Sequence, residues 1–182
     1  MGLSLLMNRG GGKAAKKDFV GDGAQALRQT EGSNPVSSKV DEGVTAFLGL
    51  FRNFEPDSVS ESALQVYSKQ AYFNDGFAEL SGREAIADYL VRTAAATRAL
   101  EVELEHRAIT GGDVYLRWVM RFTTSGRRSR TIVTPGVSHL RFDEEGQVTY
   151  HRDYWDASGA LAEFVPGMGA VLGTVRNRIE SM

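Results

Sequence analysis

The chain has 182 residues, of which 21 are basic and 23 acidic, and a formal net charge of -2. This length fits one domain with an ordinary core. The near-balanced charge excludes the cationic field that nonspecific binding to nucleic acid or anionic lipid needs. The chain has no cysteine, which excludes disulfides, thiolate catalysis and sulfur-ligated metals. The apolar run at residues 3–7 is too short for a signal-peptide core or a membrane span, so we expect a cytoplasmic protein.

Residues 1–37 predict a mobile N-terminal arm. They combine glycine, lysine and scattered polar residues, with no apolar period that a helix or strand could use. Such an arm is either a partner-binding tail or a solvated extension, and the small number of aromatic residues favours the extension.

Three amphipathic helices are predicted next, each behind a capping box in which Ser precedes an acidic residue by three positions. The boxes begin at Ser38, Ser58 and Ser81. Between the second and third helices, residues 71–77 are aromatic enough for a strand that bends at Asp75-Gly76.

From Leu100 onward the apolar period becomes two, which predicts a meander of strands. Turn residues separate these strands, and Pro135-Gly136 divides the segment 128–142 into two of them. A helical period returns over 161–182, where two arginines are too few to favour membrane contact. Helices followed by such a meander predict an α+β fold in which the helices cover one face of a curved antiparallel sheet.

The last predicted strand ends in the hexapeptide 151–156, where strand alternation separates two trios of side chains. The trios are His151, Asp153 and Trp155, and Arg152, Tyr154 and Asp156. Either trio could handle protons beside an aromatic surface. The structural alternative is a sheet edge with solvated charges and a core Trp, and a one-residue bulge would exchange the two faces.

The order of helix, helix, aromatic strand, Ser81-Gly82-Arg83-Glu84-Ala85-Ile86 and four strands ending in the hexapeptide resembles a known family. It is the SnoaL-like and ketosteroid-isomerase-like branch of the nuclear transport factor 2 superfamily. The resemblance covers roughly residues 38–160 and leaves the arm and the C-terminal extension, 161–182, outside. It implies a cystatin-like α+β barrel whose strongly curved antiparallel sheet forms a conical pocket for a small apolar molecule. It also implies no cofactor and a homodimer through the outer sheet face.

The resemblance also places candidate site residues. Asp75 stands where the family has its proton-shuttling carboxylate, with His151 and Asp153 as catalytic partners facing the pocket. Phe47 and Ser138 stand where the family has two oxyanion donors, but Phe47 cannot donate and Ser138 donates more weakly than an acid. Apolar side chains would complete the pocket wall, namely Trp118, Met120, Phe122 and Trp155.

Structural roles remain open for the two aspartates. Asp75 belongs to an Asp-Gly dipeptide that is common in bends, and Asp153 could pair with Arg121 or Arg141 on a neighbouring strand. The three histidines lack ligand spacing, so we expect no metal. For His151 we expect a proton relay or a hydrogen-bond donor instead. Two functions therefore stay open. One is a cofactor-free acid-base enzyme, such as an isomerase, cyclase, dehydratase or hydrolase, acting on an apolar ring-containing ligand. The other is a non-catalytic ligand-binding or dimerisation module.

Overall fold

The computed structural model describes residues 21–32, 35–126, 129–157, 174 and 177–178. Lys13–Trp155 form one unit, and Met1–Gly12 with Asp156–Met182 form another. The elements described below belong to the first unit. Most of the predicted arm and nearly all of the predicted C-terminal helix lie outside the described residues. Among the helices that the structure describes, none is both long and apolar enough to cross a membrane.

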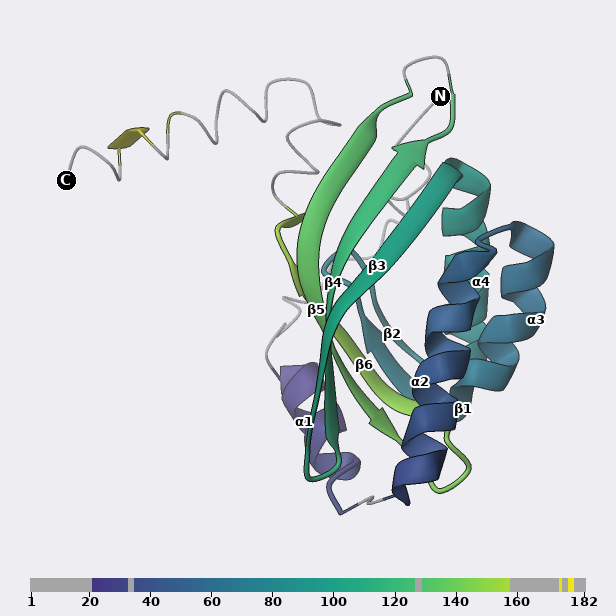
Figure 1. Ribbon diagram of the computed structural model, residues 1–182, viewed down its shortest axis with the longest axis vertical. Coiled ribbons are helices and arrows are strands. Elements are labelled where there is room, and N and C mark those ends of the chain that lie inside the picture. Colours follow the sequence, from purple (N-terminus) through teal and green to yellow (C-terminus); the bar gives the residue numbers. More distant parts are fainter. Residues whose placement is uncertain (1–20, 33–34, 127–128, 158–173, 175–176, 179–182) are drawn as a thin grey trace, which may run out of the picture. The chain divides into compact units, whose positions relative to one another are not determined.

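The described residues of this unit form four helices and six strands, which confirms the predicted α+β class (Figure 1). In chain order they are α1 (Gly21–Gln29), α2 (Ser37–Arg52), α3 (Pro56–Val66), β1 (Tyr67–Asn74), β2 (Glu79–Ser81), α4 (Arg83–Ala96), β3 (Thr97–Thr110), β4 (Asp113–Thr124), β5 (Thr131–Phe142) and β6 (Val148–Trp155). The strands form one curved, unclosed sheet in the order β2-β1-β6-β5-β4-β3.

One pair of strands departs from the predicted antiparallel sheet. β1 pairs with β6 in parallel, while all other neighbours are antiparallel, so the sheet is mixed. A parallel pair needs a long crossover connection, and the segment from β2 to β5 between these two strands provides one. Local alternation cannot reveal which distant strands become neighbours.

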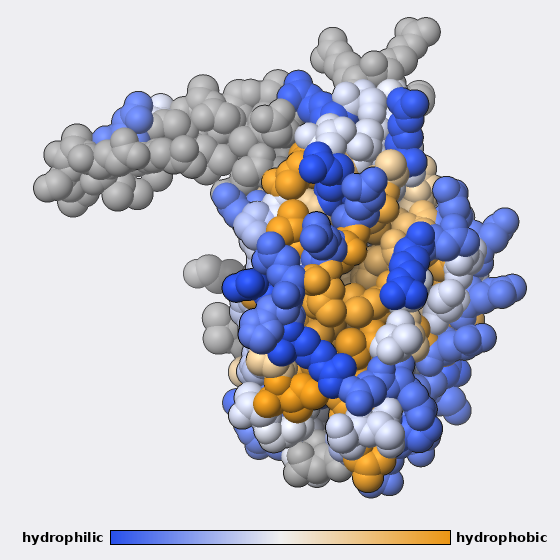
Figure 2. Space-filling view, in the orientation of Figure 1, coloured by the Kyte–Doolittle hydropathy of each residue, from blue (hydrophilic) through white to orange (hydrophobic). Residues whose placement is uncertain are grey.

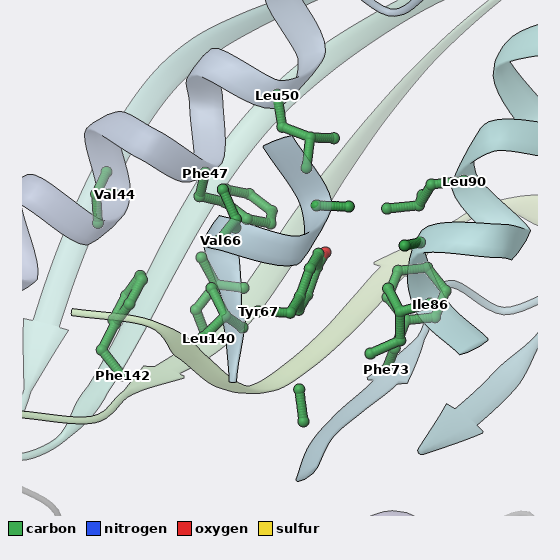
Figure 3. Close-up of a cluster of buried hydrophobic side chains, with 14 of the residues drawn as sticks. Val44, Phe47, Leu50, Val66, Tyr67, Phe73, Ile86, Leu90, Leu140 and Phe142 are labelled. Atoms are coloured by element: carbon green, nitrogen blue, oxygen red, sulfur yellow. The ribbon is translucent and has the colours of Figure 1, made fainter. Parts of the chain in front are cut away.

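Helices α2, α3 and α4 pack on the concave face of the sheet and bury the main core (Figure 1). Figure 3 shows Tyr67 in the middle of this core, with Phe47 and Leu50 of α2 on one side and Ile86 and Leu90 of α4 on the other. Tyr67 is fully buried. The start of β1 therefore lies at the point where both helices meet the sheet.

The predicted capping boxes are wrong. The N-cap residues of α2, α3 and α4 are Val36, Glu55 and Gly82, and none of them makes a side-chain cap hydrogen bond. Pro56 supports the start of α3 because its fixed φ suits the first helical turn. Packing of the apolar stripe, rather than capping, then determines where these helices begin.

The predicted break at Pro135-Gly136 is also wrong, because β5 runs through both residues. Pro135 lies one residue past the last β5–β6 pair, Gly136 with Trp155. At Pro135 the strand has a neighbour on one side only, where a missing N–H is tolerated.

Helix α1 was not predicted, because Leu27 is the one large apolar side chain in residues 21–29. It is held by tertiary contacts on the outer face of the sheet. Nη1 of Arg141 donates to the carbonyl oxygen of Leu27 at 2.6 Å, and Gly23 packs closely against Tyr72 and Arg152. Because Leu140 and Phe142 are core residues, strand alternation places Arg141 on the opposite face.

Candidate functional site

Strand β6 directs His151 and Asp153 toward the helices and Arg152 and Tyr154 away from them. The ring of His151 is 1% exposed and packs edge-on against Phe47 of α2, with 5.0 Å between ring centroids. Tyr154 is 50% exposed, and Arg152 lies over its ring. The expected division into two faces is therefore the one that the structure shows.

A continuous chain of hydrogen bonds joins residues from four strands in this interior. The hydroxyl of Tyr67 lies 2.8 Å from Nδ1 of His151, and Nε2 of His151 lies 2.8 Å from Oδ1 of Asp153. Ser138 donates to the same Oδ1 at 2.6 Å and accepts from Nε1 of Trp118 at 2.9 Å. We call these five residues the inner network.

Gly136 explains how Trp118 reaches the inner network. The two residues are paired across β4 and β5, and a Cβ atom at position 136 would overlap the indole ring. The absent side chain lets the indole lie flat over β5, where its N–H meets Ser138. A glycine that looked like a strand break is thus a packing requirement.

Asp153 does not form an ion pair with Arg121 or Arg141, the two partners considered from the sequence. Among the described residues, Arg121 pairs with Glu101 and Arg141 pairs with Asp113. The two hydrogen bonds to Asp153 both reach Oδ1, and Oδ2 accepts none from a described residue. The side chain keeps 17% of its area exposed. Asp153 is therefore a largely buried carboxylate with one oxygen that accepts no hydrogen bond from a described residue.

Asp75 lies apart from the inner network and is held by a turn. Its Oδ1 accepts from the backbone N–H groups of Phe77 and Ala78, at 2.9 and 2.8 Å, and its Oδ2 accepts from the hydroxyl of Tyr89 at 2.6 Å. The indole of Trp155 donates to its carbonyl oxygen. Burial raises the pKa of the Asp75 carboxyl, against these hydrogen bonds, and the charge of Asp153 adds to the rise. The turn role considered for this residue is present, without an arginine partner among the described residues.

Tyr67 and Tyr89 were not identified from the sequence. The hydroxyl of Tyr67 bonds to His151, and that of Tyr89 bonds to Asp75. The predicted second helix ended at Tyr67 or Ser68, whereas Tyr67 is the first residue of β1. Burial raises the pKa of the Tyr67 phenol well above its usual value, and the charges of Asp153 and Asp75 contribute. Burial likewise raises the pKa of Tyr89, with Asp75 as the next cause. Both phenols are therefore hydrogen-bond donors at neutral pH.

Apolar side chains surround the site on the helix-facing side. Phe47 and Trp118 are buried, while Met120, Phe122 and Trp155 are partly exposed. Figure 2 shows hydrophobic side chains gathered in a hollow between the sheet and the helices. Of the predicted wall residues, Phe47 packs against His151 and Trp118 bonds to Ser138, while Met120 and Trp155 pack against the same core.

Two cavities lined by described residues lie away from the candidate residues. One, of about 370 Å³, lies between α1 and strands β1 and β2. The other, of about 210 Å³, lies between the α2–α3 turn and the start of β3. Neither is lined by Asp75, His151 or Asp153, so the predicted conical pocket stays a prediction. No cluster of three His, Asp or Glu that could hold a metal ion occurs in the part of the chain that the structure describes.

Comparison with solved structures shows the same fold in proteins of low sequence identity. A hypothetical protein from Catenulispora acidiphila with a ketosteroid-isomerase-like fold, in complex with trimethylamine, is 23% identical, with a TM-score of 0.57 over 67% of this chain and 91% of that one. A Shewanella denitrificans protein, provisionally named a SnoaL-like polyketide cyclase, is 19% identical, with a TM-score of 0.57 over 67% and 96%. An LEH-like epoxide hydrolase of M. tuberculosis is 21% identical, with a TM-score of 0.54 over 77% and 99%.

No curated protein matches the chain. The family model of the SnoaL-like domain matches residues 43–151, which is more than half of the sequence and includes α3, α4 and most of the sheet. The chain therefore belongs to the SnoaL-like domain family.

Proposed function

We propose that this protein is a small-molecule pocket protein that catalyses cofactor-independent proton transfer on an apolar, ring-containing ligand, with Asp153 as the general base. One observation carries the proposal. Two hydrogen bonds hold Oδ1 of Asp153, while Oδ2 accepts none from a described residue, and the side chain shares the helix-facing side of β6 with the buried His151. A base needs a lone pair within reach of the ligand's proton, and Oδ2 offers one.

The surroundings of Asp153 suit such a reaction. The nearby rings of Phe47 and Trp118 are buried, so a ligand that fills the hollow would meet little water there. Isomerisation, cyclisation, dehydration and hydrolytic ring opening all include a proton abstraction that one carboxylate can perform. The names of two structural neighbours, a polyketide cyclase and an epoxide hydrolase, belong to this range.

Asp75 was the predicted base, and we propose a different role for it. Both of its carboxylate oxygens already accept hydrogen bonds, from the turn and from Tyr89. In our proposal Asp75 holds the β1–β2 turn and the hydroxyl of Tyr89 in place. The choice between the two aspartates is open to experiment.

A thermal-shift screen with mono-, bi- and tricyclic ketones and epoxides tests the proposal. Compounds that raise the melting temperature are then incubated with the wild type, Asp153→Asn and Asp75→Asn, and turnover is measured. We expect Asp153→Asn to lower turnover on the order of 100-fold, the usual contribution of a general base. Turnover that survives Asp153→Asn would contradict the proposal. Stabilising compounds that the wild type never converts would support the non-catalytic binding module instead.

We also propose a homodimer through the outer face of the sheet. An apolar strip on β5 and β6 is uncovered there, with Val133 51% and Tyr154 50% exposed, and Val137 paired with Tyr154. Ion pairs between β3 and β4 flank the strip and could cross to a second copy. Sedimentation equilibrium should give a dimer for the wild type and a monomer for Val133→Glu. A monomeric wild type at all concentrations would exclude this dimer.

A further inference from the structure

We infer that His151 is a positioning residue and not a proton-transfer group. The inner network fixes the imidazole proton on Nε2 and leaves Oδ2 of Asp153 as the oxygen that receives a ligand's proton. The inference deepens the proposed function and rests on it, because it assigns roles within the same site. Of the two roles that the sequence left open for His151, a proton relay and a hydrogen-bond donor, it selects the second.

The direction of the hydrogen bonds is fixed at the Trp118 end. An indole N–H can only donate, so Oγ of Ser138 accepts from Trp118 at 2.9 Å. The hydroxyl proton of Ser138 is then free to point at Oδ1 of Asp153, 2.6 Å away. An ionised carboxylate only accepts, so this end of the network runs from Trp118 to Asp153 in one direction.

The direction is also fixed at the Tyr67 end. Tyr67 is 0% exposed, and Nδ1 of His151, at 2.8 Å, is its one hydrogen-bond partner among the described residues. If Nδ1 carried the imidazole proton, the hydroxyl oxygen of Tyr67 would have to accept a hydrogen bond from it. The hydroxyl proton of Tyr67 would then be buried without an acceptor. Tyr67 therefore donates. Burial raises the pKa of the phenol, so the proton that it donates is retained at neutral pH.

These two directions determine the state of the imidazole between them. Since Nδ1 accepts from Tyr67, the proton of the neutral ring lies on Nε2 and is donated to Oδ1 of Asp153 at 2.8 Å. The rings of Phe47 and Phe73 pack edge-on against the imidazole, each with 5.0 Å between centroids. Neither nitrogen has a lone pair left for a ligand.

The consequence for Asp153 is an asymmetric carboxylate. Oδ1 accepts from both His151 and Ser138, which stabilises negative charge on that oxygen and fixes the plane of the group. A proton taken from a ligand is then received by Oδ2. His151 and Ser138 act on the reaction only through Asp153.

Nitrogen-15 NMR of the full-length chain, labelled in its histidine imidazoles, tests the inference. The chain has three histidines, and single substitution of His106 and of His139 by Gln assigns the signals. We expect the His151 resonances of a neutral ring with a pyrrole-type Nε2 and a pyridine-type Nδ1. A protonated Nδ1, in the neutral or in the doubly protonated ring, would overturn the inference.

Tyr67→Phe supplies a second readout that a merely structural role would not move. Loss of the hydroxyl should shift the Nδ1 resonance of His151, because its hydrogen-bond donor is gone. Tyr89→Phe is the matched control, since it removes the hydroxyl bonded to Asp75 and should leave Nδ1 unchanged. An Nδ1 resonance that ignores Tyr67→Phe would overturn the inference. If Tyr67→Phe does not fold, the wild-type spectrum decides alone.

The two proposals fail in different ways. A protonated Nδ1 together with turnover that needs Asp153 would overturn the role of His151 and keep the proposed function. An Nε2-protonated ring in a protein that converts no stabilising compound would overturn the function and support the hydrogen-bond directions.

Discussion

The molecule contains two histidine-aspartate pairs on opposite faces of one sheet, and their surroundings give them different roles. On the inner face, Nε2 of His151 lies 2.8 Å from Oδ1 of Asp153. On the outer face, Nε2 of His139 lies 2.7 Å from Oδ1 of Asp113. We call these the inner pair and the outer pair. Their contact geometry is nearly the same, so geometry alone does not identify the reactive one.

An arginine distinguishes the outer pair. Nε of Arg141 donates to Oδ1 of Asp113 at 2.6 Å, and Nη1 of Arg141 donates to Leu27 of α1. Burial opposes ionisation of Asp113, but hydrogen bonds from Arg141 and His139 prevail and lower its pKa. The outer pair thus joins α1 to the sheet. The inner pair has a serine in place of the arginine, so its carboxylate charge is not neutralised by a described cation and stays available for chemistry.

The largest expected effect follows from removing that arginine. Arg141→Met leaves the partly buried Asp113 without its cation and should lower the free energy of unfolding by about 2 kcal/mol, the usual cost of losing hydrogen bonds to a charged group. Amides of residues 21–32 should also exchange faster with deuterium, because α1 loses its contact with the sheet. Arg121→Met, which removes a partner of the exposed Glu101, is the control and should cost less than about 1 kcal/mol. Equal losses in the two variants would contradict the distinction.

Tyr67→Phe, beside the inner pair, should lower the free energy of unfolding by less than Arg141→Met does. Nδ1 of His151 would be buried without a donor, at a cost of about 1.5 kcal/mol in urea unfolding. Tyr115→Phe is the matched change beside the outer pair, where the partly exposed Tyr115 stacks on His139, and it should cost less than about 0.5 kcal/mol. If both variants unfolded alike, Tyr67 would not be part of a buried network.

The pH dependence of stability should depend on the outer pair. Burial lowers the pKa of His139 below its usual value, although Asp113 opposes this, and Arg141 and Arg152 contribute to the decrease. The unfolded chain therefore binds a proton at higher pH than the folded one. Stability should be full above about pH 6.5, the usual pKa of histidine, and should fall as the pH drops through the folded value. In His139→Gln this part of the decrease should disappear from urea unfolding curves measured at several pH values. An unchanged curve would exclude His139 as its source.

The smallest effect is expected at the edge of the outer face. Arg117 and Glu105 form an exposed ion pair at 3.1 Å. Glu105→Gln should change the free energy of unfolding by less than about 0.5 kcal/mol, because water screens such pairs. A loss comparable to that of Arg141→Met would mean that surface charge, and not burial, determines the strength of these contacts.

Only the inner side of this comparison could be predicted from the sequence. Alternation along 151–156 placed His151 and Asp153 on one face, and the order of helices and strands indicated the fold. The partners of these residues depend on contacts between distant elements. Tyr67 joins His151 across 84 positions of the chain. Arg141 joins α1 across 114 positions, and neither contact leaves a local pattern.

Contacts between distant parts of the chain overrode the predicted capping boxes and also bear on the predicted role of Asp75. Ser38, Ser58 and Ser81 had the correct local chemistry, but packing of the apolar stripes determined where the helices begin. The prediction of Asp75 as the base rested on its position in the chain. The hydrogen bonds that occupy both of its oxygens are visible only in three dimensions.

The most direct test of the central claim, that Asp153 is a general base in an apolar site, is the ring opening of 5-nitrobenzisoxazole. A base removes the ring C–H proton, the N–O bond breaks, and the electrons end on a coloured phenolate. We predict that the wild-type chain accelerates this reaction over free acetate. We also predict that Asp153→Asn lowers the rate on the order of 100-fold, whereas Asp75→Asn retains most of it. A rate that survives Asp153→Asn and is lost in Asp75→Asn would contradict the claim.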